Sequence, residues 1–330
     1  MNAAEILRAE AAKRIIIKDG AYGTLIQERR LDSADYCAGL DLIKDQRGNN
    51  DLLNITQPEV VRSICESFAD AGAEILATNT FNGNAISQAD YAAEALVTHI
   101  NLASARIVRE VADSYSAKDG KQRWVAGALG PTNKTLSLSP NVNDPAYREV
   151  DFDQVKAVYR EQIDALVEGG VDFILVETIF DTLNAKAAIM ATLEAEQALG
   201  RALPLMISMT LTDLSGRNLS GHTVEAFWAS VRHVLSADRC SKAGKGIRRF
   251  NREVGAEREL RAAIEDRLPR IGASEAVGPK AGFRHQPVAR LVRRLHRGDD
   301  PSRCEPRNVR RIGDLEMLNS PTPLGTVRLR

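Results

Sequence analysis

The chain has 330 residues, 44% of them hydrophobic, and its 44 lysine and arginine residues balance 44 aspartate and glutamate residues, enough for one large domain or two ordinary ones. No stretch approaches the roughly 20 apolar residues that cross a bilayer, and the N-terminus lacks the apolar run of a signal peptide. Four scattered cysteines (Cys37, Cys65, Cys240 and Cys304) argue against a disulfide framework, so we expect a soluble, cytoplasmic protein with no membrane partner.

The first 232 residues alternate short apolar runs with longer helical patterns. The apolar runs predict β-strands at 14–18, 74–78, 123–129, 171–176 and 204–209. Apolar residues that recur every three to four positions predict helices at 58–71, 84–113, 154–168 and 183–199, with one more beginning near Thr223. A capping-box pattern with an early proline, TQPE at 56–59, precedes the first of these helices, and Gly72 stands where it ends.

This alternation indicates a parallel β-sheet covered by helices, either an open doubly wound sheet or a (β/α)₈ barrel. A distinctive polar segment follows each strand: DGAYGT, TNTFNGN, GPTNKTLSLSP, ETIFD and TLTDLSGRNLSG. A barrel enzyme draws its site from the C-terminal ends of many strands, whereas an open sheet concentrates it at one switch point. The sequence has no GxGxxG motif and no Walker motif. The distribution therefore favours a TIM-type barrel.

In this order, the five segments resemble the homocysteine-binding module of cobalamin-dependent methionine synthase, in the homocysteine S-methyltransferase family. The resemblance covers about residues 10–233 and rests on DGAYGT, TNTF, GALGPTNKTLSLSP, VETIFDTLNAKAA and SGRNLSG. It implies a (β/α)₈ barrel that binds homocysteine and zinc, in which the zinc-bound thiolate takes a methyl group from methylcobalamin. A coordinating metal deprotonates a thiol that is otherwise largely protonated at neutral pH.

In the family, three cysteine thiolates hold the zinc, one in an Asn-Cys-Ser type motif and two as an adjacent pair in a Gly-Gly-Cys-Cys-Gly motif. This sequence has neither motif. Cys65 falls on the apolar face of the 58–71 helix, so we predict that it is a core residue. We predict that Cys37 is a surface thiol. Cys240 and Cys304 stand alone in ADRCSK and PSRCEP. We therefore assign no metal ligand and no catalytic residue.

The resemblance implies a substrate site at the strand ends. Glu177, which follows four apolar residues, pairs with the amino group of an amino-acid substrate or, alternatively, accepts backbone N–H groups. Gly20 and Ala21, after Asp19, lend backbone N–H groups to the substrate carboxylate or form an ordinary turn. Four further residues line the pocket or cap helices. They are Thr78, Asn79, Thr80 and Asp181.

The final 98 residues differ in composition. Residues 1–232 hold 22 Lys+Arg against 32 Asp+Glu, a net of −10, and residues 233–330 hold 22 against 12, a net of +10, with 19 of the 22 being arginine. Three interpretations are open: a basic nucleic-acid-binding arm, an extra domain with helical content at 252–268, and translation in a shifted reading frame. The abrupt loss of pattern near residue 233 favours the last, which predicts a disordered tail.

The sequence thus predicts a barrel at 1–233 that is truncated after its fifth βα unit, followed by an unrelated Arg-rich tail at 234–330. We expect a homocysteine S-methyltransferase module that is defective because its zinc-ligand motifs are absent, with cobalamin carried on another module. The alternative is a catalytically silent fragment that binds a small amino acid through Asp19, Gly20 and Glu177. Nucleic-acid binding through the tail is a third, weaker interpretation, because only two aromatic residues are available there for stacking.

Overall fold

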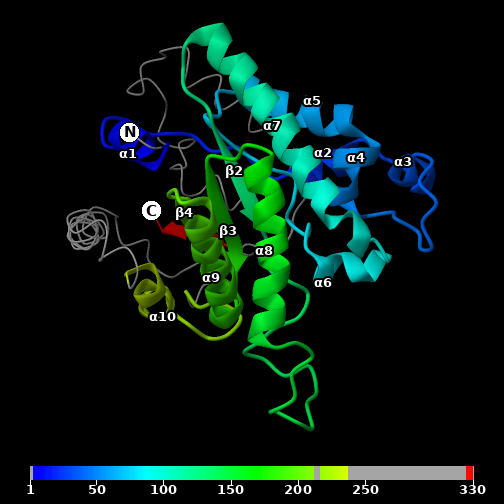
Figure 1. The fold of residues 1–330 in the computed structure, drawn as a ribbon, viewed down its shortest axis with the longest axis vertical. Helices are drawn as coiled ribbons and strands as arrows, with labels where there is room; N and C mark the ends of the chain where they lie inside the picture. The colour runs from blue at the N-terminus through cyan, green and yellow to red at the C-terminus, as the bar shows by residue number, and fades with distance from the viewer. Residues whose placement is uncertain (1–2, 212–215, 237–324, 330) are drawn as a thin grey trace, which may run out of the picture.

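The computed structural model describes residues 3–211, 216–236 and 325–329 (Figure 1). The α-helices are α1 (Ala3–Ala11), α2 (Tyr22–Glu28), α3 (Ser33–Cys37), α4 (Leu53–Thr56), α5 (Pro58–Asp70), α6 (Ala85–Gln88), α7 (Val97–Asp119), α8 (Phe152–Glu168), α9 (Thr182–Leu199) and α10 (Val224–Ser236). The strands are β1 (Ile75–Ala77), β2 (Trp124–Leu129), β3 (Phe173–Ile179), β4 (Leu205–Leu211) and β5 (Gly325–Leu329). Within these described ranges, no helix combines the length and apolar character that a bilayer crossing requires.

The strands form one sheet in the order β1-β2-β3-β4-β5. The pairs from β1 to β4 are parallel, and β5 is antiparallel to β4. Helices connect the parallel strands, because parallel neighbours need long crossover connections. The chain is therefore an α/β protein with a parallel sheet, consistent with the TIM-barrel family.

The predicted strand at 14–18 is wrong in its extent. This segment runs beside β1, but its only bridge joins Lys18 to Ile75, and the Asp19 amide donates to the Ile75 carbonyl at 2.9 Å. β1 itself is only three residues long, and the chain turns into α2 at Tyr22. The ladder is too short for a strand, and Ile15 is exposed.

Alternate residues of the strands divide the sheet into two faces. Ile174, Val176 and Ile207 pack into the main core beneath the helices, and α5, α7, α8 and α9 lie on this side in Figure 1. Phe173 and Leu175 belong to a second cluster together with side chains of α1, which lies on the opposite side of the strands (Figure 1). We call these the helix face and the inner face.

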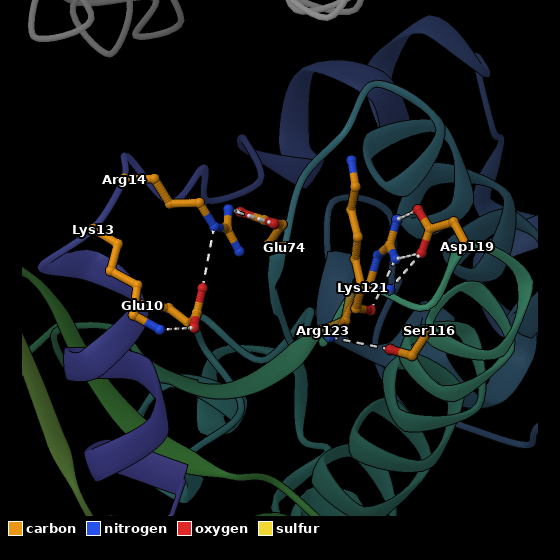
Figure 2. Close-up of polar contacts among 8 residues, drawn as sticks. All are labelled: Glu10, Lys13, Arg14, Glu74, Ser116, Asp119, Lys121 and Arg123. Carbon is orange, nitrogen blue, oxygen red and sulfur yellow. Dashed lines mark hydrogen bonds and ion pairs between the residues drawn. The ribbon is translucent and has the colours of Figure 1, made fainter.

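Ion pairs fix the N-terminal ends of two strands (Figure 2). Arg14, just after α1, binds both carboxylate oxygens of buried Glu74 at 2.7 and 2.8 Å. Arg123, buried before β2, pairs with Asp119 at the end of α7, and its hydrogen bond lowers the pKa of the Asp119 carboxyl. These contacts anchor the end of the sheet opposite the polar segments.

Two helix predictions need correction. No side chain caps α5; Pro58 is at its first turn as predicted, but the Thr56 hydroxyl bonds the Leu52 carbonyl instead. The predicted helix at 84–113 is broken into α6, two 3₁₀ turns (Ala89–Tyr91 and Glu94–Leu96) and α7, with Ala92 in the left-handed region at φ 53°. Ala93, between the two turns, and Val97, the first residue of α7, are buried, so the apolar spacing holds from Ala93 into α7.

Gly130, directly after β2, allows a close contact between neighbouring strand ends. Its amide donates to the Phe81 carbonyl at 3.1 Å, and a Cβ atom at this position would overlap that carbonyl and the Phe81 ring. We expect Gly130→Ala to destabilise the protein by about 1–3 kcal/mol, because the backbone must shift. Thermal or urea unfolding of the full chain measures the change.

Gly23→Ala in α2 is the matched control. Nothing lies within 4 Å of its added Cβ, so helix propensity predicts an unchanged or slightly raised stability, by up to about 1 kcal/mol. Equal unfolding midpoints for the two variants would contradict the close contact at Gly130.

Candidate functional site

The five polar segments lie at the C-terminal edge of the sheet; the first is hydrogen-bonded to the end of β1, and each of the others is hydrogen-bonded to the next. The bonds run from the Ala77 amide to Asp19 Oδ2 (2.7 Å), from Gly130 N to Phe81 O (3.1 Å), from Ser137 N to Asp181 Oδ2 (2.8 Å) and from Ser220 Oγ to Phe180 O (2.6 Å). Segments far apart in the sequence therefore form one continuous rim.

Glu177 lies on the inner face of β3, at the start of a β-bulge. Val176 pairs with Ile207 and Ile179 with Met209, so β3 has one more residue than β4 between these pairs. Thr178 occupies the left-handed region at φ 57°, which is unusual for a β-branched residue. Since Val176 and Ile179 both pack on the helix face, Glu177 continues the inner-face positions of Phe173 and Leu175. The apolar run did not reveal this bulge.

Asp19 lies on the opposite side of the sheet from Glu177, among helix-face groups. Its Oδ1 pairs with Lys18 Nζ at 2.8 Å and its Oδ2 accepts the Ala77 amide. Tyr22 and Cys65 are close enough that burial first, and the Asp19 charge among the further causes, raise their pKa values, that of the Cys65 thiol to about 12. Asp19 thus ties the first segment to β1.

Thr78, Asn79 and Thr80 are buried within a polar network on the helix face. The Thr78 and Thr80 hydroxyls are 2.6 Å apart and bond the amide and carbonyl of Ala128 in β2. Asn79 Nδ2 donates to the Asn50 carbonyl, and its amide donates to Ser104 of α7. The structure thus joins these residues to one another, but on the other face of the sheet from Glu177.

Asp181 caps α9 and also holds the long loop after β2. Its Oδ1 accepts the amides of Leu183 and Asn184, and its Oδ2 accepts those of Leu136 and Ser137 at 3.1 and 2.8 Å. The Ser137 hydroxyl adds a bond at 2.6 Å. Five donors surround this carboxylate, so its role in the structure is to join the loop to the helix.

Gly20 and Ala21 lead from Asp19 into α2. Ala21 is the residue before the first turn of that helix, with an extended backbone and no side-chain cap. Gly20 is half-buried and Ala21 is exposed, whereas Asp19 is buried. Both residues are therefore more accessible than the carboxylate before them.

A small depression lies beside Glu177, with about 260 Å³ of empty space that includes open solvent. Residues of β3, of its following turn, of α8 and α9, and of the turn after β2 line it. They are Gly130, Pro131, Tyr159, Val176, Glu177, Ile179, Phe180, Asp181, Asn184 and Ala185. Burial raises the pKa of Tyr159, whose hydroxyl donates to the Gly130 carbonyl at 2.9 Å.

The described residues do not fit a zinc site. No group of three or more His, Cys, Asp or Glu side chains among them could hold a metal ion. Cys65 is buried as predicted, and its high pKa keeps it a neutral thiol. Cys37 is half-buried at the end of α3 rather than on an open surface. Cys240 and Cys304 lie outside the described residues.

Comparison with known proteins identifies the protein family to which this chain belongs. A model of homocysteine S-methyltransferases matches residues 16–244, more than half of the chain. The chain belongs to the homocysteine S-methyltransferase family. The match extends 11 residues beyond position 233, where the sequence resemblance was expected to stop.

Two solved structures share the fold of this homocysteine S-methyltransferase family member. The metallated form of the homocysteine methyltransferase MmuM from Escherichia coli is 22% identical, with a TM-score of 0.54 over 69% of this chain and 74% of that one. The oxidized form is 21% identical, with a TM-score of 0.53 over 69% and 73% of the two chains.

The two roles of Asp181 can be separated by Asp181→Asn. An asparagine oxygen still caps α9, but its amide group would oppose the Leu136 and Ser137 amides, which are also donors. We expect the loop at 131–150 to detach, so that limited proteolysis cleaves it at least several-fold faster, with little loss of helix.

Asp151→Asn is the control, because Asp151 caps α8 through the Gln154 amide without holding a distant loop, and asparagine caps equally well. If Asp181→Asn is cleaved no faster than this control, Asp181 does not hold the loop.

Asp51 is a buried carboxyl group behind the rim. It accepts the Asn82 amide at 2.9 Å, and burial raises its pKa to about 7. An unfolded aspartate has a pKa of about 3.9, so the folded state binds the proton more tightly. The corresponding stability is fully present below about pH 4 and is lost as the pH rises to about 7.

We therefore expect the free energy of unfolding to fall between pH 4 and 7 by up to about 1.4 kcal/mol per pH unit from this group. Asp51→Asn should remove this component, measured by urea unfolding across that range. Asp41→Asn, at an exposed position, should leave it intact. An identical pH slope in the Asp51→Asn variant and the natural chain would contradict the assignment.

Proposed function

We propose that the chain is the homocysteine-binding module of a methionine synthase, whose inner-face carboxylate Glu177 pairs with the substrate ammonium. The observation that carries this proposal is the place of Glu177, which alternation with Phe173 and Leu175 puts on the inner face at the C-terminal edge of the sheet. Family membership supports homocysteine as the amino acid. Gly20 and Ala21, across the sheet beside β1, would receive the substrate carboxylate.

We further propose that the isolated chain does not transfer methyl groups. Cys65 is a neutral core thiol, and the described side chains offer no set of metal ligands, so no step through zinc is derived. A cobalamin-bearing module on another chain would have to supply the methyl group. We also propose a cytoplasmic location, in keeping with the free thiols of Cys37 and Cys65.

In the domain division that we propose, residues 1–233 form an incomplete homocysteine-binding barrel and residues 234–330 form a separate basic segment, of which β5 pairs with β4. Sequencing of the DNA across codons 225–245 tests the shifted-frame origin of the second part. A frame that restores an Asn-Cys-Ser motif and a Cys-Cys pair supports it, and the absence of such a frame contradicts it.

A catalytically silent amino-acid-binding fragment is the second candidate, favoured by the lack of metal ligands in the described ranges. The two candidates differ in the effect of zinc on homocysteine binding, which isothermal titration with and without zinc measures. Binding that zinc strengthens supports the methyltransferase module, and binding that zinc leaves unchanged supports the silent fragment. Methionine formation by protein that carries stoichiometric zinc would contradict the proposed inactivity.

Glu177→Gln tests the substrate assignment. Loss of the carboxylate charge should weaken homocysteine binding at least about tenfold, because a charge-assisted hydrogen bond to the ammonium is lost. Ligand-observed NMR titration of the full chain measures the affinity. Exposed Glu161→Gln on α8 is the control, and equal affinity in all three proteins would show that Glu177 does not bind the substrate.

A further inference from the structure

A polar side chain on β4 faces the same side of the sheet as Glu177. Met206 packs into the inner-face cluster, whereas Ile207 and Met209 pack on the helix face. Strand alternation therefore puts Ser208 and Thr210 on the inner face. Both are buried, with exposed fractions of 1% and 5%.

Thr210 lies next to the β3 bulge in the sheet. Ile179 pairs with Met209, so Thr210 directly follows the last β4 residue that pairs with β3. The bulge sets two residues, Glu177 and Thr178, against Ser208 alone. Ser208 is thus opposite Glu177, and Thr210 is its diagonal neighbour on the inner face of the adjacent strand, nearer the edge where the site is expected.

The Thr210 hydroxyl is a buried polar atom with no hydrogen-bond partner among the described residues. Such an atom costs stability unless something binds it. By contrast, the buried hydroxyl of Thr192 in α9 bonds the Ala188 carbonyl at 2.8 Å. An unsatisfied hydroxyl near the Glu177 carboxylate indicates a group that forms its hydrogen bond with a ligand.

We propose that Thr210 is a further substrate-contacting residue, whose Oγ1 accepts a hydrogen bond from the α-ammonium of the amino acid that Glu177 binds. This inference rests on the proposed function. An ammonium group has three donors, and one carboxylate leaves at least one of them to be satisfied. A neutral oxygen on the neighbouring strand provides that acceptor without adding charge.

The sequence analysis did not select Thr210, which stands in the apolar-rich run LMISMTL. What indicates Thr210 in the sequence is the alternation of polar and apolar residues within this run. Ser208 and Thr210 are the polar members of an otherwise apolar strand, and they share one face. A strand with both faces packed by apolar groups would not carry two hydroxyl groups two residues apart on the same face.

Thr210→Val tests the proposal, because valine keeps the shape of threonine without its hydroxyl. Three ligands are titrated by ligand-observed NMR with the full chain: homocysteine, 3-aminopropanethiol, which lacks the carboxylate, and 4-sulfanylbutanoate, which lacks the amine. We expect about tenfold weaker binding of the two amines and unchanged binding of 4-sulfanylbutanoate. Thr210→Ser should restore most of the affinity.

Thr192→Val is the matched control and should bind all three ligands as the natural chain does. The unfolding temperature gives an independent readout: Thr210→Val should be at least as stable as the natural chain, because it removes an unsatisfied buried hydroxyl. A clear loss of stability would mean that the hydroxyl has a structural partner, and would overturn the proposal.

The outcomes separate the two claims. Homocysteine binding that depends on Glu177 but is equal in Thr210→Val and the natural chain overturns the Thr210 assignment alone. No binding of any of the three ligands to the natural chain overturns both the assignment and the proposed function. Weaker binding of 4-sulfanylbutanoate along with the amines overturns the ammonium contact.

Discussion

The alternation of β3, together with the bulge that ends it, is the constraint on which the candidate site depends. Val176 and Ile179 must both remain in the apolar core beneath the helices, yet three positions separate them, which in a regular strand would send them to opposite faces. The extra residue resolves this conflict, with Thr178 in a left-handed conformation. As a result Ile179 returns to the core, while Glu177 keeps the inner-face position that alternation with Phe173 and Leu175 gives it.

The polar residues at the strand ends fall into two groups with different structural roles. Asp19, Thr78 and Asp181 accept backbone amides, and the Asn79 side chain donates to a backbone carbonyl, so these residues attach the strand ends to neighbouring segments. Glu177 lies on the inner face. A site that must hold a ligand in a fixed geometry needs both, because its side chains are only as well positioned as the loops that support them.

The sequence was informative where a local pattern has one structural meaning. The apolar runs located β1 to β4, and the polar segments after them indicated which edge of the sheet carries the site. It was uninformative where the answer depends on a partner strand or on a face. The bulge at Thr178 is defined only by the register with β4, and the segment at 14–18 fails as a strand because β1 offers too short an edge.

The same limit explains the site residues. Aspartate, asparagine and threonine after a strand suit both ligand binding and loop attachment, and only the hydrogen-bond partners distinguish these roles. For Asp181, five donors make the distinction. Thr210 is the opposite case, since a threonine within an apolar run gives no local indication that its hydroxyl is left without a described partner.

A crystal structure of the full chain grown with homocysteine tests the central claim most directly. The account predicts the amino acid on the inner face of the sheet, with its ammonium nitrogen within hydrogen-bond distance of a Glu177 carboxylate oxygen. Homocysteine bound on the helix face instead, with its ammonium on Asp19 or Asp181 and Glu177 turned away, would contradict it.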